Sequence, residues 1–159
     1  MLRYARNDKP IYMLQIETKT FQELTTKELY SLLQLRVEIF CVEQNCVYQD
    51  LDGKDEKALH VIGNKNNRIV AYTRVFKPGD YFEKASIGRV LVSKEEREHK
   101  YGYDIMEASI KTVKDYFNET AIKLSAQTYL TKFYNNLGFN EIGEEYLEDG
   151  IPHIIMEID

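Results

Sequence analysis

A charged segment between a strand-like run and a helix-like run is the first place where this sequence could do chemistry. Residues 87–93 are largely apolar, and helical spacing of apolar residues begins at Gly102. Between them lies KEEREHKY, whose backbone N–H groups would meet the positive end of the helix dipole. Arg97 and Lys100 add cationic side chains, and the glycine allows a ligand to approach the backbone closely. The pattern is typical of a pyrophosphate site, although an ordinary charged connection would look the same.

The elements that must position this segment follow from the hydrophobic pattern. Residues 14–21, LQIETKTF, alternate apolar and polar positions, as a half-buried strand does. Residues 25–28, TTKE, form a capping-box signature, and the apolar positions after them predict an amphipathic helix that ends near Val42. Residues 43–57 carry acids and turn formers without periodicity, which predicts a long loop of a kind that is often functional.

The remaining chain is expected to continue as strands and helices. The predicted order is β-α-β-β-β-α-β-α-β-β, with a meander of three antiparallel strands before a central helix. We interpret residues 13–159 as a single α/β domain and residues 1–12 as an N-terminal extension. The expected strands are 58–63, 68–76, 85–93, 122–126, 139–146 and 151–158, and the expected helices are 102–117 and 130–137.

The composition is that of a packed globular protein. The chain has 159 residues, of which 43% are hydrophobic and 30% are charged. A formal net charge of -5 argues against nucleic-acid binding, because phosphate affinity rests on clustered Lys and Arg. No apolar run is long enough to cross a membrane, and MLRYARNDKPIY lacks the apolar core of a signal peptide, so we expect a cytoplasmic protein. Cys41 and Cys46 show no metal-ligand spacing, and we expect free thiols and no metal.

Several motifs resemble the GNAT superfamily of acetyltransferases. Residues 87–92, IGRVLV, followed by Arg97, Lys100 and Gly102, are similar to motif A, which holds the pyrophosphate of acetyl-CoA. Residues 133–139, FYNNLGF, resemble motif B in wording and position. The segments RVEIFCVEQ (36–44), YQDLDG (48–53) and EDGIPH (148–153) resemble the ElaA-type branch of the superfamily.

The resemblance implies a GNAT fold, with acetyl-CoA as the cofactor. This fold is a mixed, twisted sheet of about seven strands flanked by helices, in which the fourth and fifth strands splay apart around the pantetheine arm. One departure is Lys100, which stands where the superfamily has its first loop glycine and which adds a positive charge to the loop. The cofactor contacts implied by the resemblance come from Val90, Leu91, Val92, Arg97, Glu98, His99, Lys100, Tyr101, Gly102, Tyr103, Gln127 and Tyr134.

Acetyl transfer to an amine requires a neutral amine, stabilisation of the developing oxyanion and a proton for the departing thiolate. We assign the proton to Tyr134, because a phenol remains protonated at neutral pH, although a tyrosine that only packs on the domain is the alternative. Backbone amides at Leu91 or Val92 would serve the oxyanion. His60 and His153 are the first candidates for the general base, and either could instead be a hydrogen-bonded structural histidine. Glu43, Asp50 and Glu145 are further candidates for the base.

The acidic loop and the C-terminal hairpin could line a pocket for a small or peptide amine, or could form a solvated acidic face. Arg74 and Arg89 could pair with these acids or bind an acceptor carboxylate. The resemblance also allows a homodimer. Two alternatives to the enzyme remain open: a non-catalytic acyl-CoA sensor of the same fold, and a structural or partner-binding protein. The candidate acceptor-binding residues are Glu43, Tyr48, Asp50, Arg74, Arg89 and Glu145.

Overall fold

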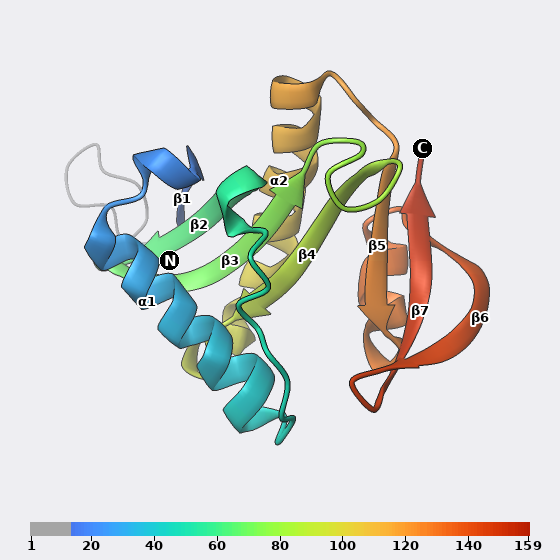
Figure 1. The fold of residues 1–159 in the computed structure, drawn as a ribbon, viewed down its shortest axis with the longest axis horizontal. Helices are drawn as coiled ribbons and strands as arrows, with labels where there is room; N and C mark the ends of the chain where they lie inside the picture. Colours follow the sequence, from blue (N-terminus) through green and yellow to red (C-terminus); the bar gives the residue numbers. More distant parts are fainter. Residues whose placement is uncertain (1–13) are drawn as a thin grey trace, which may run out of the picture.

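Seven strands form one mixed sheet in the computed structural model, which describes residues 14–159 (Figure 1). The predicted extension, residues 1–12, lies outside the described residues and stays a prediction. The spatial order of the strands is β1-β2-β3-β4-β5-β7-β6, and all neighbours are antiparallel except β4 and β5. The strands are β1 (Gln15–Thr20), β2 (Leu59–Lys65), β3 (Arg68–Phe76), β4 (Ala85–Val92), β5 (Ile122–Gln127), β6 (Asn140–Glu148) and β7 (Ile151–Ile158).

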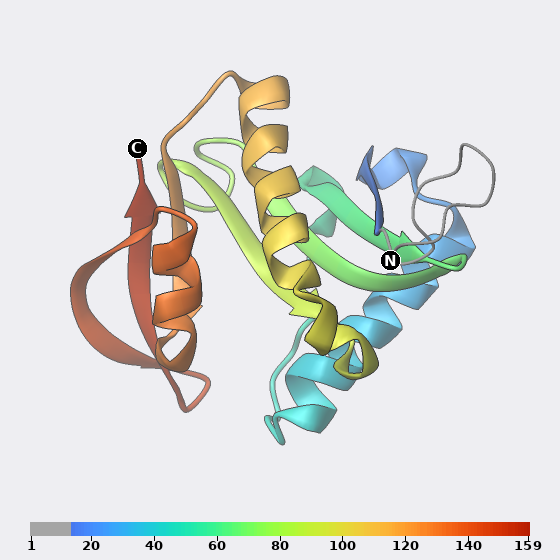
Figure 2. The same ribbon diagram turned by 180° about the vertical axis from the view of Figure 1, so that it is seen from behind.

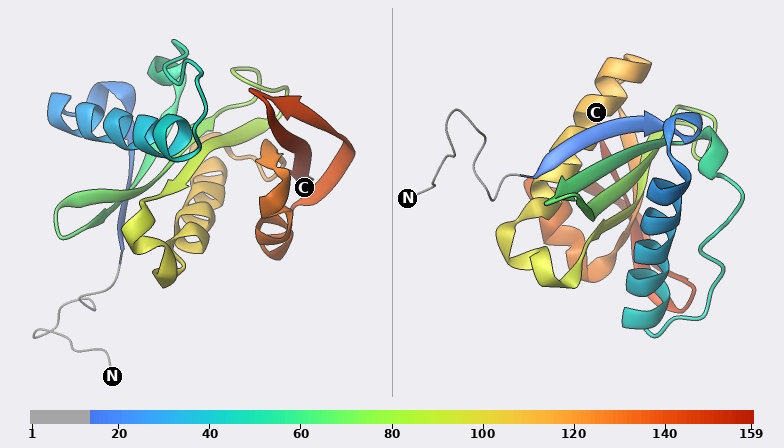
Figure 3. Two further views of the ribbon diagram at one scale, coloured as in Figure 1. Left: turned by 90° about the horizontal axis from the view of Figure 1, so that it is seen from below. Right: turned by 90° about the vertical axis from the view of Figure 1, so that its left-hand side faces the viewer.

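Helices cover both faces of this sheet (Figures 1 and 2). The helix α1 (Thr26–Val37) lies on one face and α2 (Tyr101–Phe117) on the other, as the view from below shows (Figure 3). The short helix α3 (Thr131–Asn136) follows β5. The predicted capping box is present, since Glu28 N donates to Thr25 Oγ1 at 3.0 Å and Thr25 N donates to Glu28 Oε1 at 2.9 Å. No helix of the described residues is long and apolar enough to cross a membrane.

The alternation of side chains along β4 separates the core from a more polar face. Ala85 and Ile87 are buried in the larger apolar cluster, which includes Ile105 and Met106 of α2. The intervening residues of β4 face the side on which α1 and the long loop lie. The fold of this sheet therefore packs α2 against one face and leaves part of the other face available for a site.

The parallel strands β4 and β5 pair at only two positions, Ala85 with Ile122 and Ser86 with Lys123. Beyond these pairs the two strands diverge (Figure 1). The register between β3 and β4 shifts between Tyr72 and Arg74, at a bulge where Arg89 has a φ of 50°. The predicted fold class is confirmed, including the mixed sheet and the separation of its fourth and fifth strands.

Candidate active site

A pocket of about 450 Å³ lies on the α1 side of the sheet, where β4 and β5 separate. Its floor includes Ser86 to Val90 of β4 together with Ser125 and Gln127 of β5. The loop after α1 and the turn between β6 and β7 contribute further walls. The pocket therefore collects side chains from segments that are far apart in the sequence, as sites at strand ends commonly do.

Tyr134 lines this pocket from α3. Its side chain is packed edge-on against Phe133 at 5.0 Å and Phe139 at 6.1 Å, and the residue is only 5% exposed. Burial raises the pKa of Tyr134 above its usual value, so the phenol keeps its proton at neutral pH. In the motif FYNNLGF this residue lies on the short helix α3, which is followed by Gly138, whose φ of +100° favours glycine.

Lys100 takes the backbone conformation that glycine ordinarily supplies at the start of a loop-to-helix junction. Its φ of 59° and ψ of 28° lie in the left-handed region, immediately before α2. The lysine therefore keeps the geometry of the loop and adds a cation beside the helix N-terminus. The adjacent Gly102 has a different reason to be small, since an added Cβ would lie 3.3 Å from Phe133 Cε1.

The other residues of this loop are held by neighbouring side chains. Arg97 Nε donates to the Val92 carbonyl oxygen at 3.1 Å, and Arg97 Nη2 lies 2.8 Å from Glu43 Oε2. Glu43 therefore pairs with the loop and does not line the pocket among the described residues. His99 lies against Glu96 and Tyr101, Glu98 is exposed, and the Tyr103 hydroxyl accepts a hydrogen bond from Asn136 at 3.0 Å.

Asp50 is the centre of a buried ionic network behind the pocket. Its carboxylate accepts a hydrogen bond from Arg36 Nε at 2.9 Å and from the Tyr48 hydroxyl at 2.9 Å, and Arg89 Nε lies 2.7 Å from Oδ1. The Asp50 carbonyl oxygen also accepts hydrogen bonds from Arg36 Nη2 and Arg89 Nη2. Burial raises the pKa of Tyr48 above its usual value. Asp50 therefore connects α1, the long loop and the bulge of β4.

A second part of the network surrounds Arg74. Its two terminal nitrogens each lie 2.8 Å from an oxygen of Asp52, and Nη1 lies 3.1 Å from Asp55. Asp55 also pairs with Arg36 at 2.7 Å. Although burial acts in the opposite direction, Arg74 lowers the pKa of both aspartates, and Arg36 lowers that of Asp55 further. The sequence left open whether Arg74 and Arg89 bind an acceptor carboxylate, and the structure pairs both with aspartates.

Sequence reasoning missed Arg36, Asp52 and Asp55 as members of this network. A signal for Arg36 was present, because it falls at helical spacing between Leu32 and Ile39, which are both buried. A charged residue on the apolar face of a helix requires a buried counterion. The identity of that counterion depends on the path of the long loop, which has no periodic pattern.

His60 is separate from the pocket and has a structural role. The residue is fully buried, its Nε2 lies 2.9 Å from the Asp55 carbonyl oxygen, and its Nδ1 lies 2.7 Å from the Tyr72 hydroxyl. Because a carbonyl only accepts, Nε2 carries the proton and Nδ1 accepts from the tyrosine. Burial lowers the pKa of His60. Both ring nitrogens of this first candidate for the base are therefore used by neighbours, and His60 does not line the pocket among the described residues.

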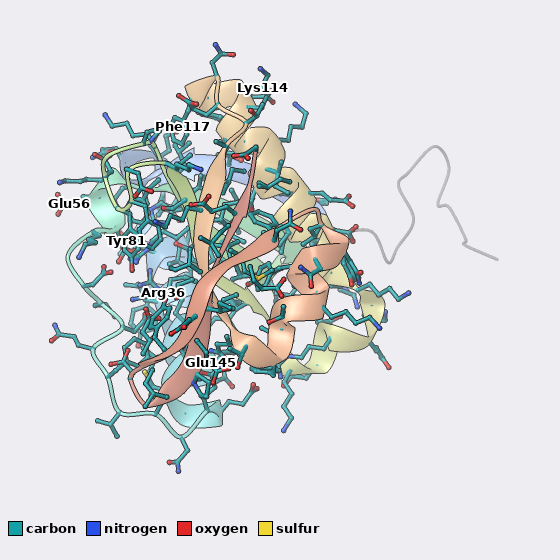
Figure 4. The ribbon with its side chains drawn as sticks, turned by 90° about the vertical axis from the view of Figure 1, so that its right-hand side faces the viewer. Arg36, Glu56, Tyr81, Lys114, Phe117 and Glu145 are labelled. Atoms are coloured by element: carbon teal, nitrogen blue, oxygen red, sulfur yellow. The ribbon has the colours of Figure 1, made fainter. Side chains whose placement is uncertain are left out.

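His153 lies at the pocket, on β7. Its Nδ1 donates to the Ile151 carbonyl oxygen at 2.7 Å, which leaves Nε2 3.3 Å from Glu148 Oε2. Gln127, opposite His153 in the β5–β7 ladder, donates to Gln44 at 3.2 Å. Glu145 is exposed on the outer strand β6 and is not among the residues that line the pocket in the described part of the chain (Figure 4).

The chain is similar to known proteins both in sequence and in structure. A family model for the acetyltransferase (GNAT) domain matches residues 25–159. The ElaA protein of Escherichia coli K12 is 42% identical over 146 residues, which are 91% of this chain and 95% of ElaA. The crystal structure of Escherichia coli ElaA matches with a TM-score of 0.86 and 41% identity, over 92% of this chain and 100% of that one.

Two further solved structures are similar. An acyl-CoA N-acyltransferase from Pseudomonas aeruginosa matches with a TM-score of 0.86 and 38% identity, over 92% of this chain and 100% of that chain. A GNAT family acetyltransferase from Elizabethkingia anophelis, solved with acetyl-CoA bound, shares the fold at a TM-score of 0.66 and 15% identity, over 92% of this chain and 97% of its own. With the family model and the ElaA relatives covering most of its length, the chain belongs to the GNAT acetyltransferase family, in the ElaA-type branch.

Proposed function

We propose that this protein is an N-acetyltransferase that moves an acetyl group from acetyl-CoA to an amine by direct attack, with Tyr134 as the proton donor. The observation that carries the proposal is the position of Tyr134, whose protonated phenol lines the pocket where β4 and β5 separate. The α2 N-terminus and its cationic loop follow directly from the same strand β4. A cofactor with an acyl group at one end and an anionic group at the other would fit this arrangement. Its acyl end would lie in the pocket and its anionic end at the N-terminus of α2.

The residues present fit acetyl-CoA as the cofactor. Because β4 pairs with β5 only as far as Ser86, the backbone of Val90 and Leu91 is free of β5 and can bind a pantetheine arm. Arg97 and Lys100 and the first amides of α2 would hold the pyrophosphate, together with the rest of the loop through Tyr103. The Elizabethkingia anophelis protein, which shares the fold, was solved with acetyl-CoA bound, and this supports the same assignment here.

The protein would supply the proton and the polar contacts of the reaction. When bound, acetyl-CoA supplies an acyl group activated as a thioester. Tyr134 holds its proton on Oη, and its raised pKa exceeds that of a thiol still further than a free phenol does. Tyr134 therefore stabilises the developing thiolate chiefly through a hydrogen bond, with full transfer of the proton late in the reaction. The backbone amides of Leu91 and Val92 are our candidates for stabilising the developing oxyanion.

We assign the general base to His153, acting with Glu148. An aliphatic amine is almost fully protonated at neutral pH, so a group at the pocket must accept a proton from it. The hydrogen bond from Nδ1 to Ile151 fixes the tautomer of His153 and leaves Nε2 as the accepting nitrogen. Glu148 lies 3.3 Å from Nε2, where its charge would stabilise the protonated ring.

Tyr134→Phe tests the proposal. We expect kcat to fall about a hundredfold, because general acid catalysis contributes roughly that much or more, with little change in the affinity for acetyl-CoA. The ring packing against Phe133 and Phe139 is kept in this variant. Tyr30→Phe is the matched control, since Tyr30 is 72% exposed on α1 and does not line the pocket among the described residues. An unchanged kcat in Tyr134→Phe would remove this residue from the mechanism.

The main alternative is an acyl-CoA sensor that has kept the fold without the reaction. A sensor would be stabilised by acetyl-CoA in thermal denaturation but would release no thiol with any amine. An enzyme would release thiol only when an amine is added. We retain the single domain of residues 13–159, the cytoplasmic location and the homodimer as proposals that these assays do not address.

A further inference from the structure

Gly88 lies in β4, and neither a left-handed φ nor a close neighbouring atom requires a glycine at this position. Its φ is outside the left-handed region, and a Cβ added to it would meet no atom within 4 Å. Gly63 differs, because an added Cβ would lie 2.8 Å from Leu14 Cδ2. Gly88 lines the pocket, one residue before the bulge at Arg89 and just beyond the last β4–β5 pair. The open volume above it is therefore available to a ligand that approaches the cleft.

Ser86 shares this face of β4 with Gly88 and also lines the pocket. The residue is 2% exposed, and its Oγ has no hydrogen-bond partner among the described residues. Buried hydroxyl groups are normally paired, because leaving one unpaired is costly. A polar ligand atom beside Gly88 is a suitable partner for this hydroxyl.

The two arginines of the pocket, Arg74 and Arg89, are both paired with aspartates, although the Nε of each has no hydrogen-bond partner among the described residues. Arg74 is held by both oxygens of Asp52 and by Asp55, and Arg89 is held by Asp50. Asp52 itself lines the pocket, so a ligand carboxylate near Arg74 would also face a carboxylate of the protein. The three arginines and three aspartates of this network balance in charge, so the wall gives an acceptor carboxylate no net attraction.

The opposite wall, at the β6–β7 turn, is acidic. Glu148 and Asp149 both line the pocket, and the ion pair of Glu148 in the described chain is with His153. Asp149 makes no ion pair within residues 14–159, and its carbonyl oxygen lies 3.4 Å from Cys46 Sγ of the facing loop. Lys54, on the other side of the pocket, lies over the ring of Tyr81 at 5.9 Å. A second cationic group on the acceptor would therefore find a complementary charge at the turn.

We propose that the part of the pocket between Gly88 and the β6–β7 turn binds a small aliphatic amine that carries a second cationic group and no carboxylate. This proposal rests on the acetyltransferase function proposed above and names its acceptor class. A volume of about 450 Å³ is at the small end for ligand pockets, and the acyl end of the cofactor must share it. Gly88 keeps the floor open, Ser86 offers a hydroxyl, and Glu148 with Asp149 attracts the second cation.

A series of three-carbon amines that differ only at the far end tests the acceptor class. Propylamine ends in a methyl group, diaminopropane with amines at both ends carries a second cation, and β-alanine carries a carboxylate. We expect kcat/KM, measured by thiol release from acetyl-CoA, to be highest for the diamine and lowest for β-alanine. Calorimetric binding of each amine to the protein saturated with coenzyme A should give the same order, independently of turnover.

Two kinds of variant test whether the diamine binds between Gly88 and the β6–β7 turn. Asp149→Asn should raise the Kd of the diamine about tenfold and leave that of propylamine nearly unchanged, as expected for a lost charged contact. Glu144→Gln is the matched control, because Glu144 is exposed on the same hairpin and does not line the pocket among the described residues. Gly88→Ala should fold with equal or greater stability, keep its affinity for coenzyme A and bind the diamine more weakly.

The outcomes separate this proposal from the function on which it rests. If coenzyme A and acetyl-CoA fail to raise the melting temperature and no amine releases thiol, the acetyltransferase proposal fails. If the cofactor binds and β-alanine equals or exceeds the diamine in kcat/KM and affinity, the acceptor proposal is wrong while the enzyme stands. Cofactor binding with no binding of the diamine, or a diamine affinity that Gly88→Ala and Asp149→Asn do not change, would also overturn the acceptor proposal.

Discussion

Replacing Asp50 by asparagine should destabilise the protein strongly, because one carboxylate compensates two arginines in the interior. Asp50 is 3% exposed and Arg36 is fully buried. The substitution keeps the size of the side chain but removes its charge, and one orientation of the amide places its NH2 group against Arg36 Nε. Removing one partner of a buried ion pair typically costs about 3–5 kcal/mol. Asp55 still pairs with Arg36, so we expect a loss of about 3 kcal/mol in this case.

Urea denaturation at neutral pH measures this loss as a lower midpoint at an unchanged m value. In a thermal scan the same change should lower Tm by about 6–12 °C for a chain of this size. Asp115→Asn is the matched control, because Asp115 pairs with Lys111 on the exposed surface of α2 and should contribute less than about 0.5 kcal/mol. A loss in Asp50→Asn no larger than that of Asp115→Asn would refute the view that this charge holds the interior together.

Two further predictions concern the backbone of the cofactor loop and the buried histidine. Lys100→Gly should be more stable than Lys100→Ala by about 1 kcal/mol in urea denaturation, because φ at this position is 59°; the opposite order would contradict the left-handed assignment. The free energy of unfolding should also fall as the pH is lowered through about 6.5, because the unfolded chain binds a proton at His60 that the folded protein, with its lowered pKa, does not. His60→Gln should show a smaller fall in the same pH range, and an equal slope in both proteins would exclude His60 as the cause.

The elements of the fold were predictable because their signals are local. The capping box at Thr25 and the apolar positions after it define the start of α1, and the glycine after α3 ends that helix. The three β-rich runs 58–63, 68–76 and 85–93, separated by turn residues, similarly predict the antiparallel strands β2 to β4. The bounds differ by a few residues, most at the end of α1, where residues 38–43 form a wider π-helical turn.

The partners of the charged residues were not predictable from local patterns. Arg74 and Arg89 meet aspartates of the long loop, and the path of this loop is set by tertiary contacts. The same limit applies to the two histidines, which look alike in sequence. His60 is enclosed by Tyr72 and the backbone of Asp55, whereas His153 lies at the pocket because the β5–β7 ladder places it opposite Gln127.

Why a given position is occupied by glycine also depends on its neighbours in the folded protein. The sequence predicts that Gly102 admits a ligand to the backbone, and the structure adds that its missing side chain makes room for Phe133. Gly88 has no such neighbour and faces open volume in the pocket. Only the packing around each position distinguishes a structural glycine from one that serves a ligand.

The most direct test of the central claim is the release of thiol from acetyl-CoA by the purified protein, measured with and without a small diamine. We expect release that depends on the amine, with one acetylated amine formed for each thiol, as detected by mass spectrometry. Release at the same rate without the amine, or no release with any amine while acetyl-CoA still raises Tm, would contradict the assignment of this pocket to acetyl transfer.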